Sequence, residues 1–171
     1  MPVLEQTSVV TMKGNPVTLL GKGVNVGDQV AEATLVANDL SEIKLSSFKG
    51  KKYILSIVPS LDTPVCDLQT KRFNQEATKL GSNVKVLTVS MDLPFAQKRW
   101  CGATNSQNVQ TLSDHRTGNL GEAFGVLIKG ARLLARAIFI VDEKGKVVYK
   151  QLVKEITQEP DYAAVLQALK K

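Results

Sequence analysis

Two apolar runs on either side of a segment with helical periodicity limit the possible folds of this chain more than any other feature. The runs are residues 53–58 and 84–90, and both have the length and β-branched content of buried strands. Between them, apolar side chains keep close to one helical face and Gly81 offers a stop: Val65, Leu68, Phe73, Ala77 and Leu80. Strand, helix and strand in this order predict a parallel crossover unit, and therefore an α/β protein.

Shorter elements are predicted on both sides of this unit. Residues 7–12 and 17–20 flank the turn-forming tetrad 13–16 and predict an N-terminal hairpin. The other expected strands are at 34–36 and 109–112, with alternation at Ile43 and Leu45 and a hairpin over 137–149. A helix is expected from Pro94 to Trp100; it carries Cys101 at its end and is closed by Gly102. Two more helices are expected over 117–124, ending at Gly125, and from near Pro160 to Leu169. This plan indicates a thioredoxin-like fold with an N-terminal β-hairpin extension over residues 1–27, the 171 residues forming one domain.

Composition argues against several classes of function. The net charge is +6, but lysines and arginines are spread along the chain, and aromatic residues make up only 5%, so we expect no nucleic-acid partner. The N-terminus lacks a basic segment followed by an apolar core, and no uncharged apolar stretch approaches the roughly 20 residues that span a bilayer. We therefore expect a cytoplasmic protein without a membrane partner, in which two cysteines are catalytic or idle rather than a permanent structural disulfide.

The turn between the first apolar run and the helix delivers a cysteine to a helix N-terminus. Thr63 suits the N-cap position and Pro64 the first helical position, which places Cys66 at N3. Unpaired backbone N–H groups and the positive end of the helix dipole stabilise a thiolate there, and the thiolate is the nucleophilic form. Gln69 stands where a Cys-x-x-Cys disulfide exchanger needs its second cysteine, so the sequence argues against that class.

Each candidate residue also has a structural interpretation. Cys66 could be a buried structural cysteine, and Cys101 could simply fill space beside Trp100. Arg136 lies in an apolar stretch, where it needs a partner if buried; the alternative is an exposed salt bridge at a sheet edge. His115, the only histidine, would be the base of a cysteine hydrolase, but it stands in a polar stretch typical of a solvated loop. Two cysteines and one histidine are too few for a structural zinc site, and no metal or organic cofactor is implied.

The segment Pro59-Ser60-Leu61-Asp62-Thr63-Pro64-Val65-Cys66 resembles the Pro-x-x-x-Thr-x-x-Cys active-site loop of the peroxiredoxins. Within that family the chain is similar to the bacterial thiol peroxidases, the atypical two-cysteine subgroup. The further matches are Gly14-Asn15-Pro16-Val17-Thr18, Asp92-Leu93-Pro94-Phe95-Ala96-Gln97 with Cys101-Gly102, and Ala135-Arg136-Ala137. The resemblance covers nearly the whole chain.

The resemblance implies roles for five residues. Cys66 would be the peroxidatic cysteine and Cys101 the resolving one; Thr63 would hydrogen-bond to thiolate and peroxide, Pro59 would shield the sulfur from bulk water, and Arg136 would hold it anionic. The implied enzyme reduces hydrogen peroxide and organic hydroperoxides through a Cys66 sulfenate and an intramolecular Cys66–Cys101 disulfide.

The resemblance also implies partners. A thioredoxin-type partner would reduce the disulfide, and the protein would form a homodimer through apolar surface near Phe95 or the active-site loop. A non-catalytic redox sensor or holdase that uses the same disulfide is the alternative. For a disulfide that joins two different helices, we expect the first turn after Thr63 and the segment around Cys101 to unwind locally during turnover.

Overall fold

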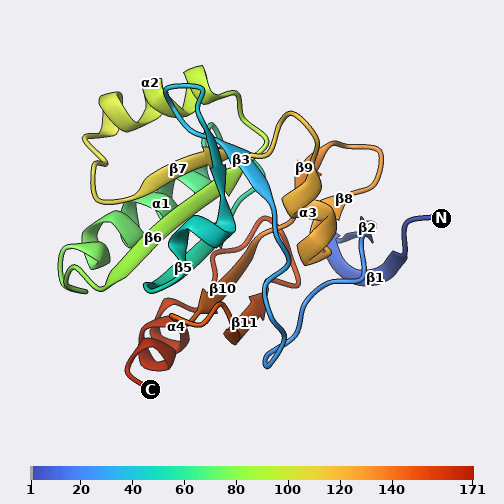
Figure 1. The fold of residues 1–171 in the computed structure, drawn as a ribbon. Helices are drawn as coiled ribbons and strands as arrows, with labels where there is room; N and C mark the ends of the chain where they lie inside the picture. The colour runs from blue at the N-terminus through green and yellow to red at the C-terminus, as the bar shows by residue number, and fades with distance from the viewer. Residues whose placement is uncertain (1) are drawn as a thin grey trace.

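The computed structural model describes residues 2–171 and arranges them around two β-sheets (Figure 1). The larger sheet has the strand order β11-β10-β5-β6-β7-β3-β4, and the smaller one has the order β1-β2-β8-β9. The strands are β1 (Glu5–Met12), β2 (Asn15–Leu20), β3 (Thr34–Val36), β4 (Glu42–Lys44), β5 (Lys52–Ile57), β6 (Val84–Ser90), β7 (Gln110–Ser113), β8 (Leu127–Ile128), β9 (Leu133–Leu134), β10 (Ala137–Val141) and β11 (Val147–Leu152). The helices are α1 (Pro64–Ala77), α2 (Pro94–Thr104), α3 (Asn119–Phe124), α4 (Tyr162–Leu169) and the 3-10 helix η1 (Leu45–Phe48).

The predicted crossover unit forms the centre of the larger sheet. β5 and β6 pair in parallel, with Leu55 opposite Leu87, and α1 connects them. β7 continues the parallel arrangement beyond β6, while β10 pairs antiparallel with both β5 and β11. Because β5 and β6 run in the same direction, the loops that follow them, residues 58–63 and 91–93, emerge at the same edge of the sheet.

Alternating side chains divide the core between the two faces of the larger sheet. On β5, Leu55 and Ile57 belong to the cluster that also contains α3 and the smaller sheet, whereas Ile54 packs with Phe73 of α1 and Val165 of α4. In Figure 1, α1 runs behind β6, and α3 lies toward the β1–β2 hairpin. The period-2 pattern of a strand buried on both faces is therefore satisfied, as a parallel sheet covered by helices requires.

The predicted N-terminal hairpin is confirmed, and it pairs with a part of the chain that the sequence did not identify. β1 and β2 are antiparallel, and β2 pairs through Leu19 with Ile128 of the two-residue strand β8. Gly21 closes the hairpin against α3 with φ of +105°, and a Cβ atom there would lie 1.9 Å from the carbonyl oxygen of Glu122. The thioredoxin-like fold with its hairpin extension is thus confirmed.

Three predicted boundaries were wrong. α1 ends at Ala77 rather than near Gly81, because the Thr78 hydroxyl donates to the carbonyl of Gln75 and the chain then turns. α2 continues through Gly102 to Thr104, so Cys101 lies within the helix, and Asn105 supplies the left-handed C-cap with φ of +53°. The expected alternation at Ile43 and Leu45 stops at Lys44, because Leu45 begins η1.

Candidate active site

The local sequence places Cys66 in the first turn of α1, as predicted. β5 ends at Ile57, the loop crosses the sheet edge, and Thr63 takes the extended N-cap conformation before Pro64 begins the helix. Cys66 is therefore at N3, and none of its surface is exposed. Its side chain packs in a small cluster with Val58, Leu61 and Trp100.

Arg136 lies directly against the sulfur of Cys66. It precedes β10, is only 2% exposed, and donates from Nη2 to Cys66 Sγ over 3.3 Å. The other two nitrogens of the guanidinium donate as well: Nε donates to the Ile156 carbonyl over 2.9 Å and Nη1 to Gln69 Oε1 over 2.8 Å. The alternative of an exposed salt bridge at a sheet edge is wrong, and the guanidinium is held rigidly beside the sulfur.

The buried guanidinium of Arg136 has no carboxylate partner among the residues that the structure describes. Within residues 2–171, no carboxylate forms a salt bridge with Arg136, whose partners are a carbonyl, an amide oxygen and the sulfur. A buried cation without a counter-ion costs several kcal/mol, on the order of the desolvation of one ion. Of the three groups that Arg136 contacts, only the side chain of Cys66 is of a type that can ionise to an anion.

Pro59 and Thr63 lie in the same turn as Cys66. Pro59 is buried ahead of the sulfur. The Thr63 hydroxyl donates to the Ser60 carbonyl over 3.0 Å, and it neither caps α1 nor bonds to Cys66 among the hydrogen bonds of the described residues. Thr63 was therefore predicted correctly as the N-cap residue, but its hydroxyl bonds within the loop rather than to the helix.

Asp92 holds the active-site loop and was not assigned a role from the sequence. Its carboxylate accepts from Ser60 Oγ over 2.7 Å, from the Leu61 backbone N–H over 2.8 Å and from Ser90 Oγ over 2.6 Å. The loops after β5 and β6 are thus tied together at the sheet edge where they emerge. The sequence signal was present in the stretch that begins at Asp92, but nothing local indicates which loop the carboxylate binds.

Gln69 and Ser56 are also site residues that sequence reasoning missed. Gln69 is fully buried, accepts from Arg136 and donates to Ser56 Oγ over 2.8 Å. It lies three residues after Cys66 and thus shares its helical face, while Ser56 is a polar residue within an apolar strand. A polar residue in a buried position needs a hydrogen-bond partner, and this requirement was the sequence signal that could have identified both residues.

Cys101 is half-buried on α2 and packs against the cluster that contains Cys66 and Trp100. Its sulfur lies 3.5 Å from Thr111 Oγ1, so the two sulfurs contact different partners. Both cysteines are free thiols. Cys101 also borders a surface groove of about 960 Å³ between α2, the end of α1 and the β3–β4 hairpin.

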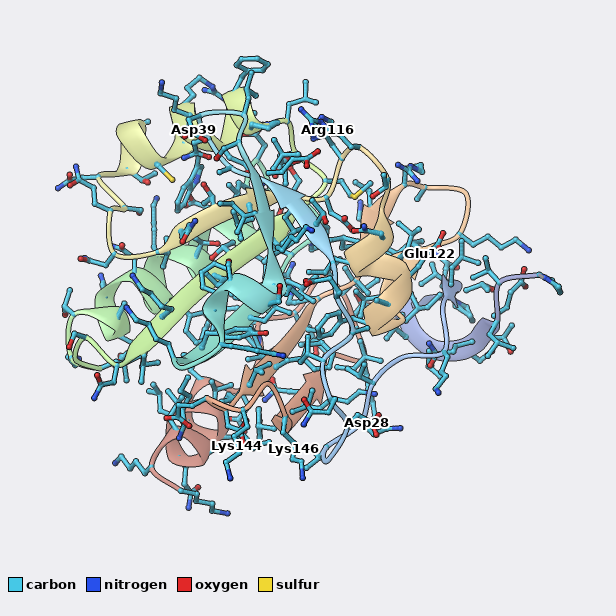
Figure 2. The ribbon with its side chains drawn as sticks, viewed as in Figure 1. Asp28, Asp39, Arg116, Glu122, Lys144 and Lys146 are labelled. Carbon is cyan, nitrogen blue, oxygen red and sulfur yellow. The ribbon has the colours of Figure 1, made fainter. Side chains whose placement is uncertain are left out.

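The remaining predicted features lie away from this cluster. The ring of His115 is half-buried and bonds through Nδ1 to Ser113 Oγ, not to Cys66, within the described chain. Charged side chains of both signs are spread over the surface: in Figure 2, Asp39 and Arg116 lie near α2 and β3, whereas Lys144 and Lys146 lie at the opposite end. From residue 2 to residue 171, no helix has both the length and the apolar character of a membrane span, and no three potential metal ligands group together.

Comparison with known proteins agrees with this architecture. The Redoxin family matches residues 25–166. The thiol peroxidase of Bacillus subtilis (strain 168) is 56% identical over 161 residues, covering 94% of this chain and 96% of the relative, and that of Staphylococcus aureus (strain MRSA252) is 50% identical over 161 residues, covering 94% and 97%. A crystal structure of a peroxiredoxin-like protein from Aquifex aeolicus has a TM-score of 0.89 at 47% identity and covers 99% of this chain and 98% of that one. The thiol peroxidase from Chromobacterium violaceum shares the fold at a TM-score of 0.84 and 20% identity, covering 94% of each chain. The chain therefore belongs to the Redoxin family and, within it, to the thiol peroxidases.

Proposed function

We propose that this protein is a thiol-dependent peroxidase that reduces hydrogen peroxide and organic hydroperoxides with Cys66 as the nucleophile. The observation that carries the proposal is the contact of 3.3 Å between the buried Arg136 guanidinium and Cys66 Sγ. Membership of the thiol peroxidases supports the same chemistry.

In the first step the Cys66 thiolate attacks one peroxide oxygen. An S–O bond forms, the O–O bond breaks, and the departing oxygen takes a proton to leave as water or an alcohol. Negative charge spreads onto both oxygens in the transition state. A fixed guanidinium and the N–H groups of the first turn of α1 stabilise that charge without having to reorganise.

Cys101 is proposed as the resolving cysteine. Its thiol attacks the sulfenic sulfur of Cys66, which releases water and forms a Cys66–Cys101 disulfide. A dithiol partner of the thioredoxin type then reduces this bond by thiol–disulfide exchange. Packing of Cys101 against the Cys66 cluster supports the pairing.

Pro59 and Thr63 are proposed to control the approach of the peroxide. Cys66 has no exposed surface, so the loop over residues 59–63 must open before a hydroperoxide reaches the sulfur. Opening would break the bond from the Thr63 hydroxyl to the Ser60 carbonyl and free the hydroxyl to donate to the bound peroxide, while Pro59 keeps bulk water out.

A thiol count and an intact mass, before and after one equivalent of an organic hydroperoxide, test this proposal on the parent and on Cys101→Ser. We expect the parent to lose both thiols without gaining oxygen, and the variant to keep a trapped Cys66 sulfenate. Survival of both thiols would overturn the peroxidase assignment. Steady-state turnover with a regenerating reductant separates an enzyme from a redox sensor, because a sensor reacts once and stops.

The assembly and the compartment are further parts of the proposal. Leu93 and Phe95, at the start of α2, are 53% and 65% exposed and offer an apolar contact for a homodimer. Sedimentation of the parent and of Phe95→Asp tests this, because only the parent should sediment as a dimer. Two cysteines that are not a permanent structural disulfide fit a reducing compartment, and we propose the cytoplasm.

A further inference from the structure

One hydrogen bond joins the helices that carry the two cysteines. Nε1 of Trp100 donates to Oδ1 of Asp67 over 2.8 Å, and from residue 2 to residue 171 no other side-chain hydrogen bond connects α1 to α2. Asp67 immediately follows Cys66, and Trp100 immediately precedes Cys101. The bond therefore connects the two helices at the residues next to Cys66 and Cys101.

The sulfurs of Cys66 and Cys101 are held by contacts on different strands, and the two helices must release these contacts when the disulfide forms. Cys66 Sγ contacts Arg136 at the start of β10, whereas Cys101 Sγ contacts Thr111 in β7. Two strands, β5 and β6, lie between β10 and β7. The backbones of β10 and β7 are therefore three strand spacings, or roughly 14 Å, apart. A disulfide requires Cα atoms within about 7 Å.

Either of the possible movements breaks the bond between Trp100 and Asp67. Unwinding the first turn of α1 frees Cys66 from Arg136 and carries Asp67 away with it. Unwinding α2 around Cys101 turns the indole of Trp100, which is 6% exposed, out of the cluster.

We propose that the Trp100–Asp67 hydrogen bond is a latch that holds the thiol conformation and sets how fast the Cys66 sulfenate passes to the disulfide. Both residues are positioning residues, and the inference rests on the proposed function, because it requires the Cys66–Cys101 disulfide.

The strength of the latch follows from its surroundings. The acceptor is a carboxylate oxygen, and the other oxygen of Asp67, Oδ2, is bound by the exposed Lys71 over 2.7 Å, in a weak surface pair. The donor is the indole N–H of Trp100, which is nearly buried. While the cluster is closed, no water can take the place of Asp67 as its acceptor. Hydrogen bonds to charged groups are among the stronger ones in proteins, but the Asp67 side chain is 29% exposed and water screens its charge in part. Loss of this bond therefore shifts a local opening equilibrium by roughly three- to tenfold.

The latch also governs a competition at the sulfenate. While the two helices stay joined, opening of the loop over residues 59–63 still admits a second hydroperoxide, which oxidises the Cys66 sulfenic acid to sulfinic acid and leaves as water or an alcohol. When the helices open, Cys101 attacks the same sulfur and water departs. A tighter latch therefore favours overoxidation, and a weaker one favours the disulfide.

Trp100→Phe tests the latch, because it removes the donor while keeping an aromatic ring in the cluster. In single-turnover quenched-flow experiments read by mass spectrometry, we expect disulfide formation to be about fivefold faster and sulfinic acid at high peroxide to fall in proportion. The first step, followed in a Cys101→Ser background, should change by less than about threefold, because Arg136 is untouched. An unchanged or slower resolution step would overturn the proposal.

Matched variants separate the latch from a general loosening of the fold. Lys71→Met breaks only the other contact of Asp67 and should resolve at the parent rate. Asp67→Asn keeps an acceptor and should lie between the parent and Asp67→Ala. Because the donor and acceptor act as a pair, the double variant Asp67→Ala with Trp100→Phe should be no faster than either single variant.

Intrinsic fluorescence reports the latch directly, since Trp100 is the only tryptophan. Oxidation of the parent should shift its emission to longer wavelength at the rate of disulfide formation, and Asp67→Ala should show part of this shift in the reduced state. Emission that does not change on disulfide formation would overturn the latch alone. Failure of the parent to form a disulfide at all would overturn the proposed function as well, so the two failures are distinguishable.

Discussion

Replacing Arg136 by methionine tests the central argument about the sulfur. The substitution removes the charge beside Cys66 but keeps an unbranched apolar stem of similar reach in a site that is 2% exposed. The guanidinium nitrogen lies 3.3 Å from Cys66 Sγ. With an effective dielectric of about 20, two unit charges at that distance attract by about 5 kcal/mol.

The expected effect on rate is smaller than this attraction, because burying the pair has its own desolvation cost. Loss of a single fixed donor to charge that develops in a transition state lowers the rate by roughly 10²- to 10³-fold, and we expect that range for the second-order reaction of Arg136→Met with hydrogen peroxide. Arg136→Lys keeps the charge but cannot reach the Ile156 carbonyl, Gln69 and Cys66 together, so its loss should be nearer tenfold, as an order of magnitude.

The assay is stopped-flow competition for a limiting amount of peroxide, with the thiol state of Cys66 read by mass. The matched control is Arg116→Met, because Arg116 is an exposed arginine whose partner is Glu42, and its rate should stay within about twofold of the parent. Removing Arg136 also leaves the Ile156 carbonyl without its donor, so each variant must first show a cooperative urea transition. A folded Arg136→Met that reacts within about threefold of the parent would refute the reasoning.

Three further predictions concern the framework of the site. Asp92→Ala removes the acceptor of the Leu61 N–H, so it should lower the free energy of unfolding by about 2 kcal/mol and slow the peroxide step. Urea titration measures the first effect and stopped flow the second. An unchanged free energy of unfolding would contradict the role of Asp92 in holding the loop. Burial raises the pKa of Asp114 from 3.8 to about 6, against the opposing effect of backbone N–H donors. Because the folded state then binds this proton more tightly than the unfolded chain, the free energy of unfolding should fall by about 3 kcal/mol as the pH rises from about 4 to above 6. Urea titrations across that range should show the slope in the parent and lose most of it in Asp114→Asn; equal slopes would contradict the assignment. Gly21→Ala should cost at least about 2 kcal/mol, because it combines φ of +105° with a Cβ 1.9 Å from the Glu122 carbonyl oxygen, and a thermal midpoint equal to that of the parent would show that the hairpin does not need this contact.

The sequence by itself determined the elements whose pattern is local. The continuous apolar runs of residues 53–58 and 84–90 predicted β5 and β6, because the length and β-branched content of such a run are properties of the strand alone. The position of Cys66 at N3 followed from Thr63 and Pro64 in the same way. Two-residue strands such as β8 and β9 contain too few residues to show a pattern. The helix α2 ends before Asn105 rather than at Gly102, because glycine and asparagine both tolerate a C-terminal turn and the sequence alone does not choose between them.

Only the tertiary structure decided what surrounds the sulfur. Arg136 is 70 positions from Cys66, and the contact exists because β10 pairs with β5 and thereby delivers its first residues to the start of α1. The same holds for Asp92, which reaches the loop after β5 from the loop after β6, and for the bond between Trp100 and Asp67. Such contacts depend on strand order and register, which are set by the packing of the whole core rather than by any local pattern.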